Sequence, residues 1–361
     1  MEKIIIIFLL WLYPIFGYSQ ETQLENNIIE NYFDLNLPSI RNFIDDTAIK
    51  LNKDPGEIEK IISESNFVQR SLDLLPPKRP GKSKTIKRNW PAYRSRFITN
   101  YRINLGKVFI QENLNTLLAA ERQFGVPVEI ISAILNVETR YGANTGDFNT
   151  RDVLATLAFY HPTRGQFFQE QLQALISLSY SSNFHLDYLN GSYAGAIGIA
   201  QFLPTSIIDF AVDFDNNGII DLNTYEDAIG SVANYLLKHG WNRKYEIEQT
   251  MISINNFSFA NINIDETEIA RIAIILKKYG VKPAIYQADL QEFGFEKSFI
   301  NNISYPLTLV DLPTGNKYTD YRLANINYYA ITRYNRSFNY ATAVYELALE
   351  LQPYIQEKRQ K

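Results

Sequence analysis

The stretch "ISAILNVETRYGAN", residues 131–144, has the periodicity of a buried helix and carries one acidic side chain within it. Pro127 suits the first position of that helix, and Gly142 suits its end. Three aliphatic residues share one stripe of the predicted helix: Ile131, Ile134 and Leu135. Glu138 follows them on the same stripe. Because an ionised carboxylate is costly to bury on an apolar face unless it is paired, Glu138 is the first candidate for a functional residue.

Two further stretches place polar side chains among small or apolar ones. "GSYAGAIGIAQFLPTS", residues 191–206, is rich in glycine and alanine, which let the backbone approach a neighbour closely. Gln201 is the one long amide in that run, and such a side chain can orient a ligand. "RYNRSFNYATAV", residues 333–344, combines aromatic rings with amide and hydroxyl groups, which belong to Tyr334, Asn335 and Tyr340. Alone, each stretch is a weak signal of function, and residues 191–206 also fit a segment of tight helix packing.

The first residues of the chain have the composition of an export signal. Residues 1–19 hold a lysine, an apolar run and the small residues Gly17 and Ser19, and the run is too short to span a bilayer comfortably. We therefore expect a signal peptide at 1–19, with an uncleaved N-terminal anchor as the alternative. The chain has no cysteine, so we expect neither disulfides nor a lipoprotein anchored through a cysteine.

The rest of the chain is predicted to be mainly α, with a small β contribution. Residues 20–95 combine amphipathic helical stretches with a segment rich in proline and basic residues, 76–94, which we interpret as a surface loop wrapping the domain. Residues 96–361 form the second unit and are dominated by helical periods. Within it, residues 306–332 have the pattern of strands around a turn. The net charge of -4 argues against a nucleic-acid partner.

Four motifs taken together resemble the lytic murein transglycosylases of the membrane-bound B type. In chain order they are "NVETRYG", "GSYAGAIGIAQFLPTS", "DAIGSVANYLLKHGW" and "ITRYNRSFNYATAV". The resemblance runs from about residue 35 to residue 352. It implies a lysozyme-like helical core with additional helices and a small β element near the C-terminus. Residues 96–361 would then be the catalytic domain with its C-terminal lobe.

The resemblance also implies a role for Glu138, as the single catalytic acid and base. Enzymes of this family cleave the glycan strands of peptidoglycan between N-acetylmuramic acid and N-acetylglucosamine, and they leave a 1,6-anhydro ring instead of adding water. A half-buried glutamate can stay protonated near neutral pH, because desolvation disfavours its charged form. A muramidase that hydrolyses the same bond and a peptidoglycan-binding protein without activity are the alternatives.

The family's substrate-binding positions fall on six residues: Ser192, Gln201, Tyr334, Asn335, Tyr340 and Arg164. Ser192 matches a serine beside the catalytic acid, and Gln201 matches a glutamine that lines the cleft. The two tyrosines and Asn335 match residues that contact the saccharides around the scissile bond. Arg164 stands in the place of an arginine pair thought to meet the stem peptide. Because Thr163 replaces the first member of that pair, we expect a weaker peptide contact.

The stretch "DFDNNGIIDLNT", residues 213–224, is similar to an EF-hand calcium loop. Its predicted ligands are Asp213, Asp215, Asn217, the carbonyl of Ile219, and Asp221. Position 12 of the loop holds Thr224 instead of an acid, with Glu226 or Asp227 as candidates to replace it. We expect either weak, structural calcium binding or a turn rich in Asn and Asp. The reaction that the resemblance implies requires no cofactor.

The resemblance also predicts where the protein works and what it meets. We expect an exported, periplasmic protein without a lipid anchor, which acts as a monomer on peptidoglycan glycan strands. Components of the cell-wall synthesis machinery are candidate partners, whereas nucleic acid is not.

Overall fold

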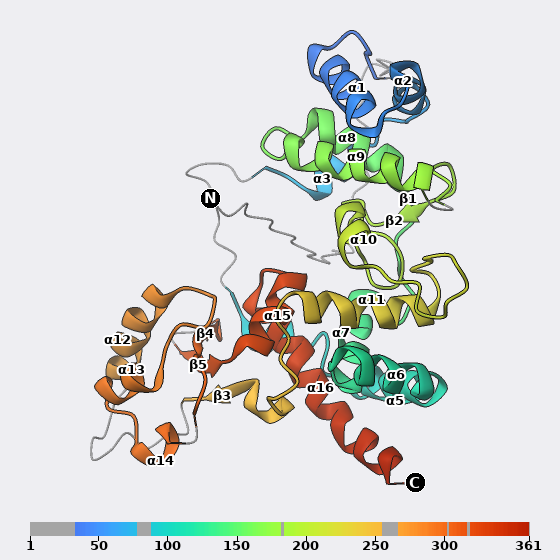
Figure 1. The fold of residues 1–361 in the computed structure, drawn as a ribbon. Helices are drawn as coiled ribbons and strands as arrows, with labels where there is room; N and C mark the ends of the chain where they lie inside the picture. Colours follow the sequence, from blue (N-terminus) through green and yellow to red (C-terminus); the bar gives the residue numbers. More distant parts are fainter. Residues whose placement is uncertain are drawn as a thin grey trace, which may run out of the picture.

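The computed structural model describes residues 33–77, 88–181, 184–254, 266–301, 303–315 and 318–360, without the side chains of residues 266–270. The predicted signal peptide, 1–19, and residues 78–87 of the basic segment lie outside this part. The described chain is mainly helical with small antiparallel sheets, as predicted (Figure 1). None of the described helices is both long enough and apolar enough to span a bilayer.

The N-terminal helices pack on a pair of helices from the middle of the chain. These elements are α1 (Pro38–Leu51), α2 (Pro55–Ser63), α3 (Gln69–Leu74), α8 (Thr150–Tyr160) and α9 (Gly165–Ser181). Both α1 and α2 begin with proline, and the Asp54 carboxylate caps α2 by accepting a hydrogen bond from the Gly56 N–H at 2.8 Å. α1 contacts α9, and α3 contacts α8. This group forms the upper part of Figure 1.

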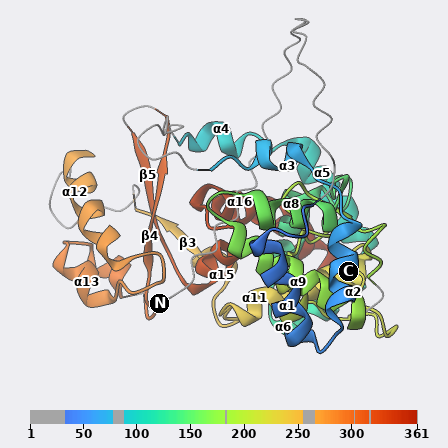
Figure 2. The same cartoon turned by 90° about the horizontal axis from the view of Figure 1, so that it is seen from above.

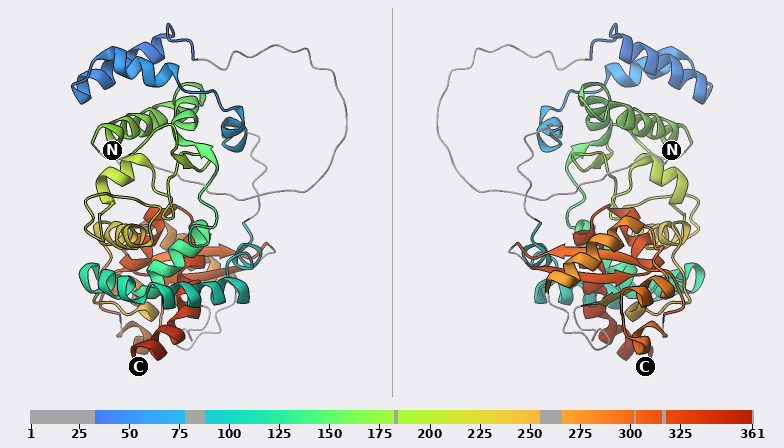
Figure 3. Two further views of the ribbon diagram at one scale, coloured as in Figure 1. Left: turned by 90° about the vertical axis from the view of Figure 1, so that its right-hand side faces the viewer. Right: turned by 90° about the vertical axis from the view of Figure 1, so that its left-hand side faces the viewer.

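A second group of helices surrounds α7. Its members are α5 (Asn100–Glu112), α6 (Leu114–Phe124), α7 (Val128–Thr139), α11 (Tyr225–Lys238) and α16 (Phe338–Arg359). α7 contacts each of the other four, and Figure 3 shows this group below the first one. Every residue from 128 to 136 is buried, as expected for a helix that is covered on all sides. α7 begins one residue later than predicted, because Pro127 is its N-cap.

The described residues between 251 and 324 form a lobe, in which a second apolar core lies between Ile254 and Leu323. Its strands pair antiparallel in the order β3 (Met251–Ser253), β5 (Thr319–Ala324), β4 (Thr308–Pro313). The short helices α12 (Glu266–Leu276), α13 (Gln287–Glu292) and α14 (Lys297–Ile300) complete it, and α12 and α13 lie beside the sheet in Figure 2. Ile254, Leu276, Leu290, Leu309 and Leu323 are among the buried residues of this core. The main apolar core runs through the other helices.

Shorter elements complete the described chain. They are α4 (Trp90–Arg94), β1 (Phe148–Asn149), β2 (Asn190–Gly191), α10 (Pro204–Phe210), α15 (Ile326–Tyr334) and the 3-10 helices η1 (Ile247–Gln249) and η2 (Lys277–Tyr279). β1 and β2 form a two-residue antiparallel ladder, in which Phe148 pairs with Gly191. The boundary predicted between residues 95 and 96 remains a prediction.

Two local predictions are wrong. Strands β4 and β5 lie within 306–332 as predicted, but residues 326–332 belong to α15, for which the Asn325 side chain provides the N-cap. Tyr328 and Ile331 are fully buried there, so packing overrides the strand preference of an aromatic and β-branched run. The basic segment, predicted as an irregular loop, ends in α4, whose N-cap is Asn89.

Candidate active site

Glu138 lies in the last turn of α7, and the chain reverses sharply after it. Arg140, Tyr141 and Gly142 all have positive φ, of 53°, 60° and 87°. This conformation costs roughly 1–2 kcal/mol for a residue other than glycine. Tertiary contacts hold the turn in place, including a 3.1 Å hydrogen bond that the Tyr225 hydroxyl donates to the Tyr141 carbonyl. The surroundings therefore fix the helix end that presents Glu138.

Hydrogen bonds to backbone carbonyls attach the loop at residues 195–203 to this helix end. The Thr139 hydroxyl donates to the carbonyl of Ile199 at 2.9 Å. From α15, the Tyr334 hydroxyl donates to the carbonyl of Ala200 at 2.6 Å. Two side chains thus hold the loop beside the turn that follows Glu138.

Tyr340, at the start of α16, is the hydrogen-bond partner of Glu138. Its hydroxyl donates to Glu138 Oε1 at 2.5 Å, and its ring is nearly parallel to that of Tyr334, with centroids 6.5 Å apart. Burial raises the pKa of the half-buried Glu138 to about 7, and the hydrogen bond from Tyr340 opposes part of this rise. Burial and the nearby carboxylate also raise the pKa of Tyr340. Tyr340 therefore stays a hydrogen-bond donor while Glu138 titrates near neutral pH.

Among the residues that the structure describes, no aspartate or glutamate is a cause of the raised pKa of Glu138. The causes of its raised pKa are desolvation and the bond from Tyr340, and neither an aspartate nor a glutamate contributes. A retaining glycosidase of the two-carboxylate kind places its second carboxyl about 5 Å from the first. The described site instead presents one titratable acid surrounded by tyrosines.

The two predicted residues from the glycine-rich stretch make hydrogen bonds to the backbone. Gln201 has a φ of 54°, and its Nε2 donates to the carbonyls of Thr145 and Gly198, both at 2.9 Å. The Ser192 hydroxyl is buried and accepts a hydrogen bond from the Ala196 N–H at 3.0 Å. These bonds shape the loop beside Glu138.

The remaining predicted residues differ in their relation to Glu138. Asn335 is buried at the end of α15, directly after Tyr334. Arg164 precedes α9, and its guanidinium lies 4.9 Å from the ring centroids of both Phe167 and Phe168. Tyr334 and Tyr340 therefore lie close to Glu138. Arg164 lies elsewhere, between α8 and α9.

Tyr93 also lies near Glu138, although its place in the sequence does not distinguish it from a packing residue. It lies on α4, and burial together with the Glu138 carboxylate raises its pKa. The only sequence signal is its place in "WPAYRSRFI", residues 90–98, where aromatic residues suit packing equally well.

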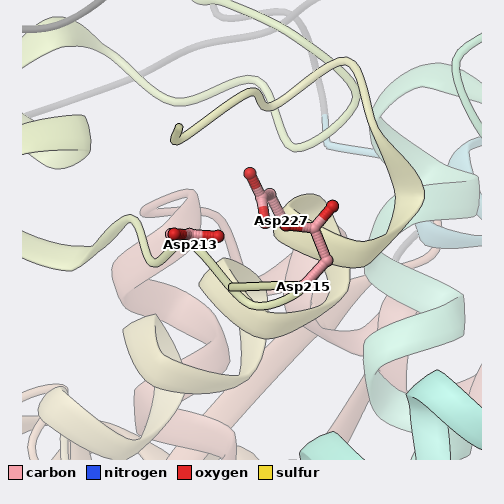
Figure 4. A group of neighbouring side chains, drawn as sticks. All are labelled: Asp213, Asp215 and Asp227. Atoms are coloured by element: carbon pink, nitrogen blue, oxygen red, sulfur yellow. The ribbon is translucent and has the colours of Figure 1, made fainter. Parts of the chain in front are cut away.

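The acidic loop brings three carboxylates together. One oxygen from each of Asp213, Asp215 and Asp227 lies within 4.8 Å of the others, at the start of α11 (Figure 4). Asp227 is fully buried, and burial together with Asp215 raises its pKa. Oxygen ligands of this kind suit a hard cation such as calcium. Asp227, named as a substitute for the missing acid at position 12, thus joins the cluster.

The other predicted ligands make hydrogen bonds within the loop. Asn217 Nδ2 donates to Asp215 Oδ2 at 2.8 Å, and Asn217 Oδ1 accepts from the Ile219 N–H at 2.8 Å. Asp221 Oδ1 accepts from the N–H of Asn223 at 2.9 Å. The described carboxylate cluster could hold a metal ion. Asp227 is its third member, whereas position 12 of the loop is Thr224 and carries no acid.

The raised pKa of Glu138 predicts a dependence of stability on pH. Glu129, in the first turn of α7, also has a pKa raised to about 7, mainly by burial. The usual value for both is 4.5. Because the folded state holds these protons more tightly, each group stabilises the fold below pH 4.5, and this stability is lost as the pH rises to about 7. A pKa rise of about 2.5 corresponds to about 3 kcal/mol for each group.

We therefore expect the free energy of unfolding of Glu138→Gln, measured by urea titration at several pH values, to fall less than that of the wild type over this range. Glu129→Gln should behave likewise, and the double variant should remove both contributions. If the difference in unfolding free energy between the wild type and each variant does not change between pH 4.5 and 7, the pKa values of the two carboxyl groups are not raised.

Comparison with known proteins gives consistent matches over most of the chain. Residues 37–349 match the family described as "Transglycosylase SLT domain". The membrane-bound lytic murein transglycosylase B of Escherichia coli (strain K12) is 34% identical over 324 residues, which cover 86% of this chain and 82% of that protein.

Solved structures have the same fold. The soluble lytic transglycosylase SltB1 from Pseudomonas aeruginosa matches with a TM-score of 0.72 and 33% identity, covering 87% of this chain and 98% of that one. The Escherichia coli lytic transglycosylase Slt35, in complex with calcium, matches with a TM-score of 0.72 and 30% identity, covering 91% of this chain and 97% of that one.

Proposed function

This chain belongs to the lytic murein transglycosylases with an SLT domain, and we propose that Glu138 is both the general acid and the general base of the reaction it catalyses. The substrate bond is the β-1,4 bond between N-acetylmuramic acid and N-acetylglucosamine, and the product is 1,6-anhydro-N-acetylmuramic acid. The observation that carries the proposal is a glutamic acid with a pKa near 7, bonded to Tyr340, without a second carboxylate acting on it among the described residues.

In the first step, Glu138 is the general acid. Because burial keeps a large fraction of it protonated near neutral pH, it delivers a proton to the glycosidic oxygen as the bond from that oxygen to C1 breaks. General acid catalysis of this kind contributes about 10²–10⁴ in rate. Tyr340, which donates to Glu138 Oε1, holds the carboxyl in place and stabilises the carboxylate that remains.

In the second step, Glu138 is the general base. Its carboxylate takes the proton of the muramic acid 6-hydroxyl while the oxygen attacks C1, which closes the anhydro ring and restores the protonated acid. Overall one bond to C1 is exchanged for another and no water is added. An attacker held within the same sugar has an effective concentration of about 10⁵–10⁸ M in well-oriented cases. Ring closure is therefore favoured over hydrolysis.

The neighbouring residues fit supporting roles in this reaction. Tyr334, Asn335 and Tyr340 offer stacking faces and hydrogen-bonding groups to the saccharides, and Ser192 and Gln201 shape the loop beside the acid. Arg164, which packs on two phenylalanine rings, is assigned a weak contact to the stem peptide. A muramidase is the second candidate, and the absence of a second carboxylate acting on Glu138 in the described residues argues against its two-carboxylate form.

The identity of the new chain end tests the reaction. Digestion of purified sacculi should yield fragments that end in anhydromuramic acid, which mass spectrometry distinguishes because they lack one water relative to the reducing sugar. Few new reducing ends should appear, because the attacking oxygen comes from the sugar itself. A majority of borohydride-reducible muramic acid ends would support the muramidase, and no cleavage at all would support a binding protein.

We assign calcium to the acidic loop, because its clustered carboxylates suit a hard cation, and the similar Slt35 has been solved in complex with calcium. Asp213, Asp215 and Asp227 supply the charge, whereas the side chains of Asn217 and Asp221 and the carbonyl of Ile219 are further ligand candidates. The ion would stabilise the folded loop and would take no part in the reaction, since the proposed chemistry does not use it.

Calcium should raise the thermal midpoint of the wild type. A site with a dissociation constant of about 1 mM would add about 1.4 kcal/mol at 10 mM calcium, since the ligand binds only the folded state. Asp215→Asn should abolish this shift, and Glu226→Gln, which changes an acid outside the cluster, should retain it. If calcium raises the thermal midpoint of both variants equally, or does not raise that of the wild type, the loop is a turn without a calcium site.

The predicted setting follows from the family. We propose an exported, periplasmic enzyme that acts as a monomer on peptidoglycan glycan strands, with cell-wall synthesis proteins as candidate partners. A lipid anchor on cysteine is not part of this proposal, since the chain has no cysteine.

A further inference from the structure

One side of the buried helix α7 carries polar side chains. Ser132, Asn136 and Thr139 are at most 1% exposed, and their spacing of four and three positions places them on the same side of the helix. The Ser132 hydroxyl lies 2.9 Å from the hydroxyl of Tyr141, and Thr139 donates to the carbonyl of Ile199. Asn136 differs from both, because its partner is a charged side chain of another helix.

Arg102, on α5, and Asn136 are joined by three hydrogen bonds. Arg102 Nη1 donates to the Asn136 carbonyl at 2.8 Å and to Asn136 Oδ1 at 3.0 Å. Asn136 Nδ2 donates to the Arg102 carbonyl at 3.1 Å. Hydrogen bonds from a guanidinium are charge-assisted and stronger than those between neutral groups. The contact therefore ties both the backbone and the side chain of Asn136 to α5.

This contact is made at the end of α7 that presents Glu138. Asn136 lies in the last turn, two positions before Glu138, and its carbonyl also accepts a 3.0 Å hydrogen bond from the N–H of Arg140, where the left-handed turn begins. The last turn of α7 contains no basic residue of its own. A cation stabilises the carboxyl end of a helix, because the helix dipole is negative there. Arg102 supplies that cation from α5.

The same guanidinium contacts the aromatic residues that lead to Tyr93. It lies 4.9 Å from the ring centroid of Phe97, and the centroids of the Phe97 and Tyr93 rings are 5.1 Å apart. Tyr93 in turn lies near the carboxylate of Glu138. Arg102 therefore joins two segments beside the acid, the end of α7 and the segment that follows α4.

We propose that Arg102 is a positioning residue for Glu138. By holding the last turn of α7, it keeps the carboxyl group in the orientation in which Tyr340 donates to it. The inference rests on the proposed role of Glu138 as acid and base. Because the hydrogen bonds of the guanidinium go to Asn136, Arg102 acts through the end of the helix and not on the substrate. A displacement of about 1 Å in an active site can lower the rate about 10²-fold.

Steady-state kinetics on soluble peptidoglycan fragments separate this role from a purely structural one. Arg102→Met keeps an unbranched stem and removes the guanidinium. It should lower kcat at least about tenfold and change KM by less than about twofold, because substrate binding is not affected. Arg102→Lys restores a charge and a donor without the planar fork, so it should recover part of the lost kcat.

Arg359→Met is the matched control. It also removes a guanidinium that joins two helices of this group, since Arg359 on α16 donates two 2.7 Å hydrogen bonds to Glu121 on α6. These residues make no contact with the end of α7 that carries Glu138, so the wild-type kcat should be retained.

A double variant tests whether Arg102 acts through the hydrogen bond between Tyr340 and Glu138. Arg102→Met and Tyr340→Phe should each lower kcat about tenfold. The combined variant should lose clearly less than the product of about a hundredfold, because the second change removes an orientation that the first has already disturbed. Two independent contributions would multiply.

Three outcomes would overturn the proposal. They are a wild-type kcat for Arg102→Met, a raised KM with an unchanged kcat, and losses that multiply in the double variant. Circular dichroism and thermal unfolding establish that each variant is folded at the assay temperature. If Arg102→Met does not fold, Arg102→Lys carries the same comparison, alone and combined with Tyr340→Phe.

Glu138→Gln, assayed beside these variants, separates this inference from the proposed reaction. A fully active Arg102→Met beside an inactive Glu138→Gln refutes the positioning role alone. An active Glu138→Gln refutes the proposed acid and base, and with it the positioning role.

Discussion

Glu138→Gln should lower the rate of glycan cleavage at least about a hundredfold and leave the fold intact. The amide has nearly the same shape as the carboxylic acid, but it can neither deliver a proton to the leaving oxygen nor accept one from the 6-hydroxyl. General acid–base catalysis accounts for about 10²–10⁴ in rate, and here both steps depend on this one group. Release of soluble fragments from purified sacculi measures the effect, and circular dichroism and thermal unfolding report on the fold.

Two other variants make this result specific. Glu112→Gln changes an exposed glutamate at the end of α5 and should retain full activity. Tyr340→Phe removes the hydroxyl that donates to Glu138 Oε1. It should lower activity about tenfold and move the pH optimum upward, because the bond from Tyr340 lowers the pKa of Glu138. If Glu138→Gln keeps more than about a tenth of the wild-type activity, the acid is another residue.

Gly146→Ala should lower the free energy of unfolding by more than about 3 kcal/mol, a large effect for one methyl group. Gly146 has a φ of 100°, and a Cβ at this position would lie 2.0 Å from the carbonyl oxygen of Gly191. That backbone cannot easily withdraw, because Gly191 pairs with Phe148 between β1 and β2. The next residue, Ser192, also donates from its N–H to the Ala196 carbonyl at 2.8 Å. Urea unfolding gives the difference from the wild type.

Gly280→Ala is the matched control for this steric effect. Gly280 also has a positive φ, of 81°, but an added Cβ there meets no atom within 4 Å. The control therefore carries only the conformational penalty, of order 1–3 kcal/mol for this backbone region, in which ψ is -166°. Equal losses for Gly146→Ala and Gly280→Ala would mean that the contact with Gly191 contributes nothing.

The features predicted from sequence are those that depend on neighbours along the chain. The buried helix of α7 was predicted from aliphatic spacing, and Glu138 was singled out because its charge conflicts with that stripe. The mainly helical fold is confirmed, since it is the sum of such segments.

The contacts that complete the site are not local, and the sequence does not contain their geometry. Glu138 and Tyr340 are 202 residues apart, so their hydrogen bond requires the packing of α16 on α7. The family resemblance named Tyr340 but did not predict this bond, and Tyr93 was not named at all. Residues 326–332 are predicted as strand because their aromatic and β-branched side chains favour one. The burial of Tyr328 and Ile331, which favours the helix α15, is a property of the folded state and cannot be read from the sequence. Asp227 joins the acidic cluster from beyond the loop for the same reason.

The separate apolar core of residues 251–324 bears on how the protein denatures. Two-state unfolding is the rule for a small domain with one core, whereas the residues around Leu290 and Leu309 are buried in one cluster and those of α7 in another. The lobe can therefore lose its packing while α7 and its neighbours keep theirs. Calorimetry would register this as a van't Hoff enthalpy smaller than the calorimetric one. The urea and thermal experiments above are best followed with two probes: Trp90, which packs in the main core, and far-ultraviolet dichroism, which reports on both cores.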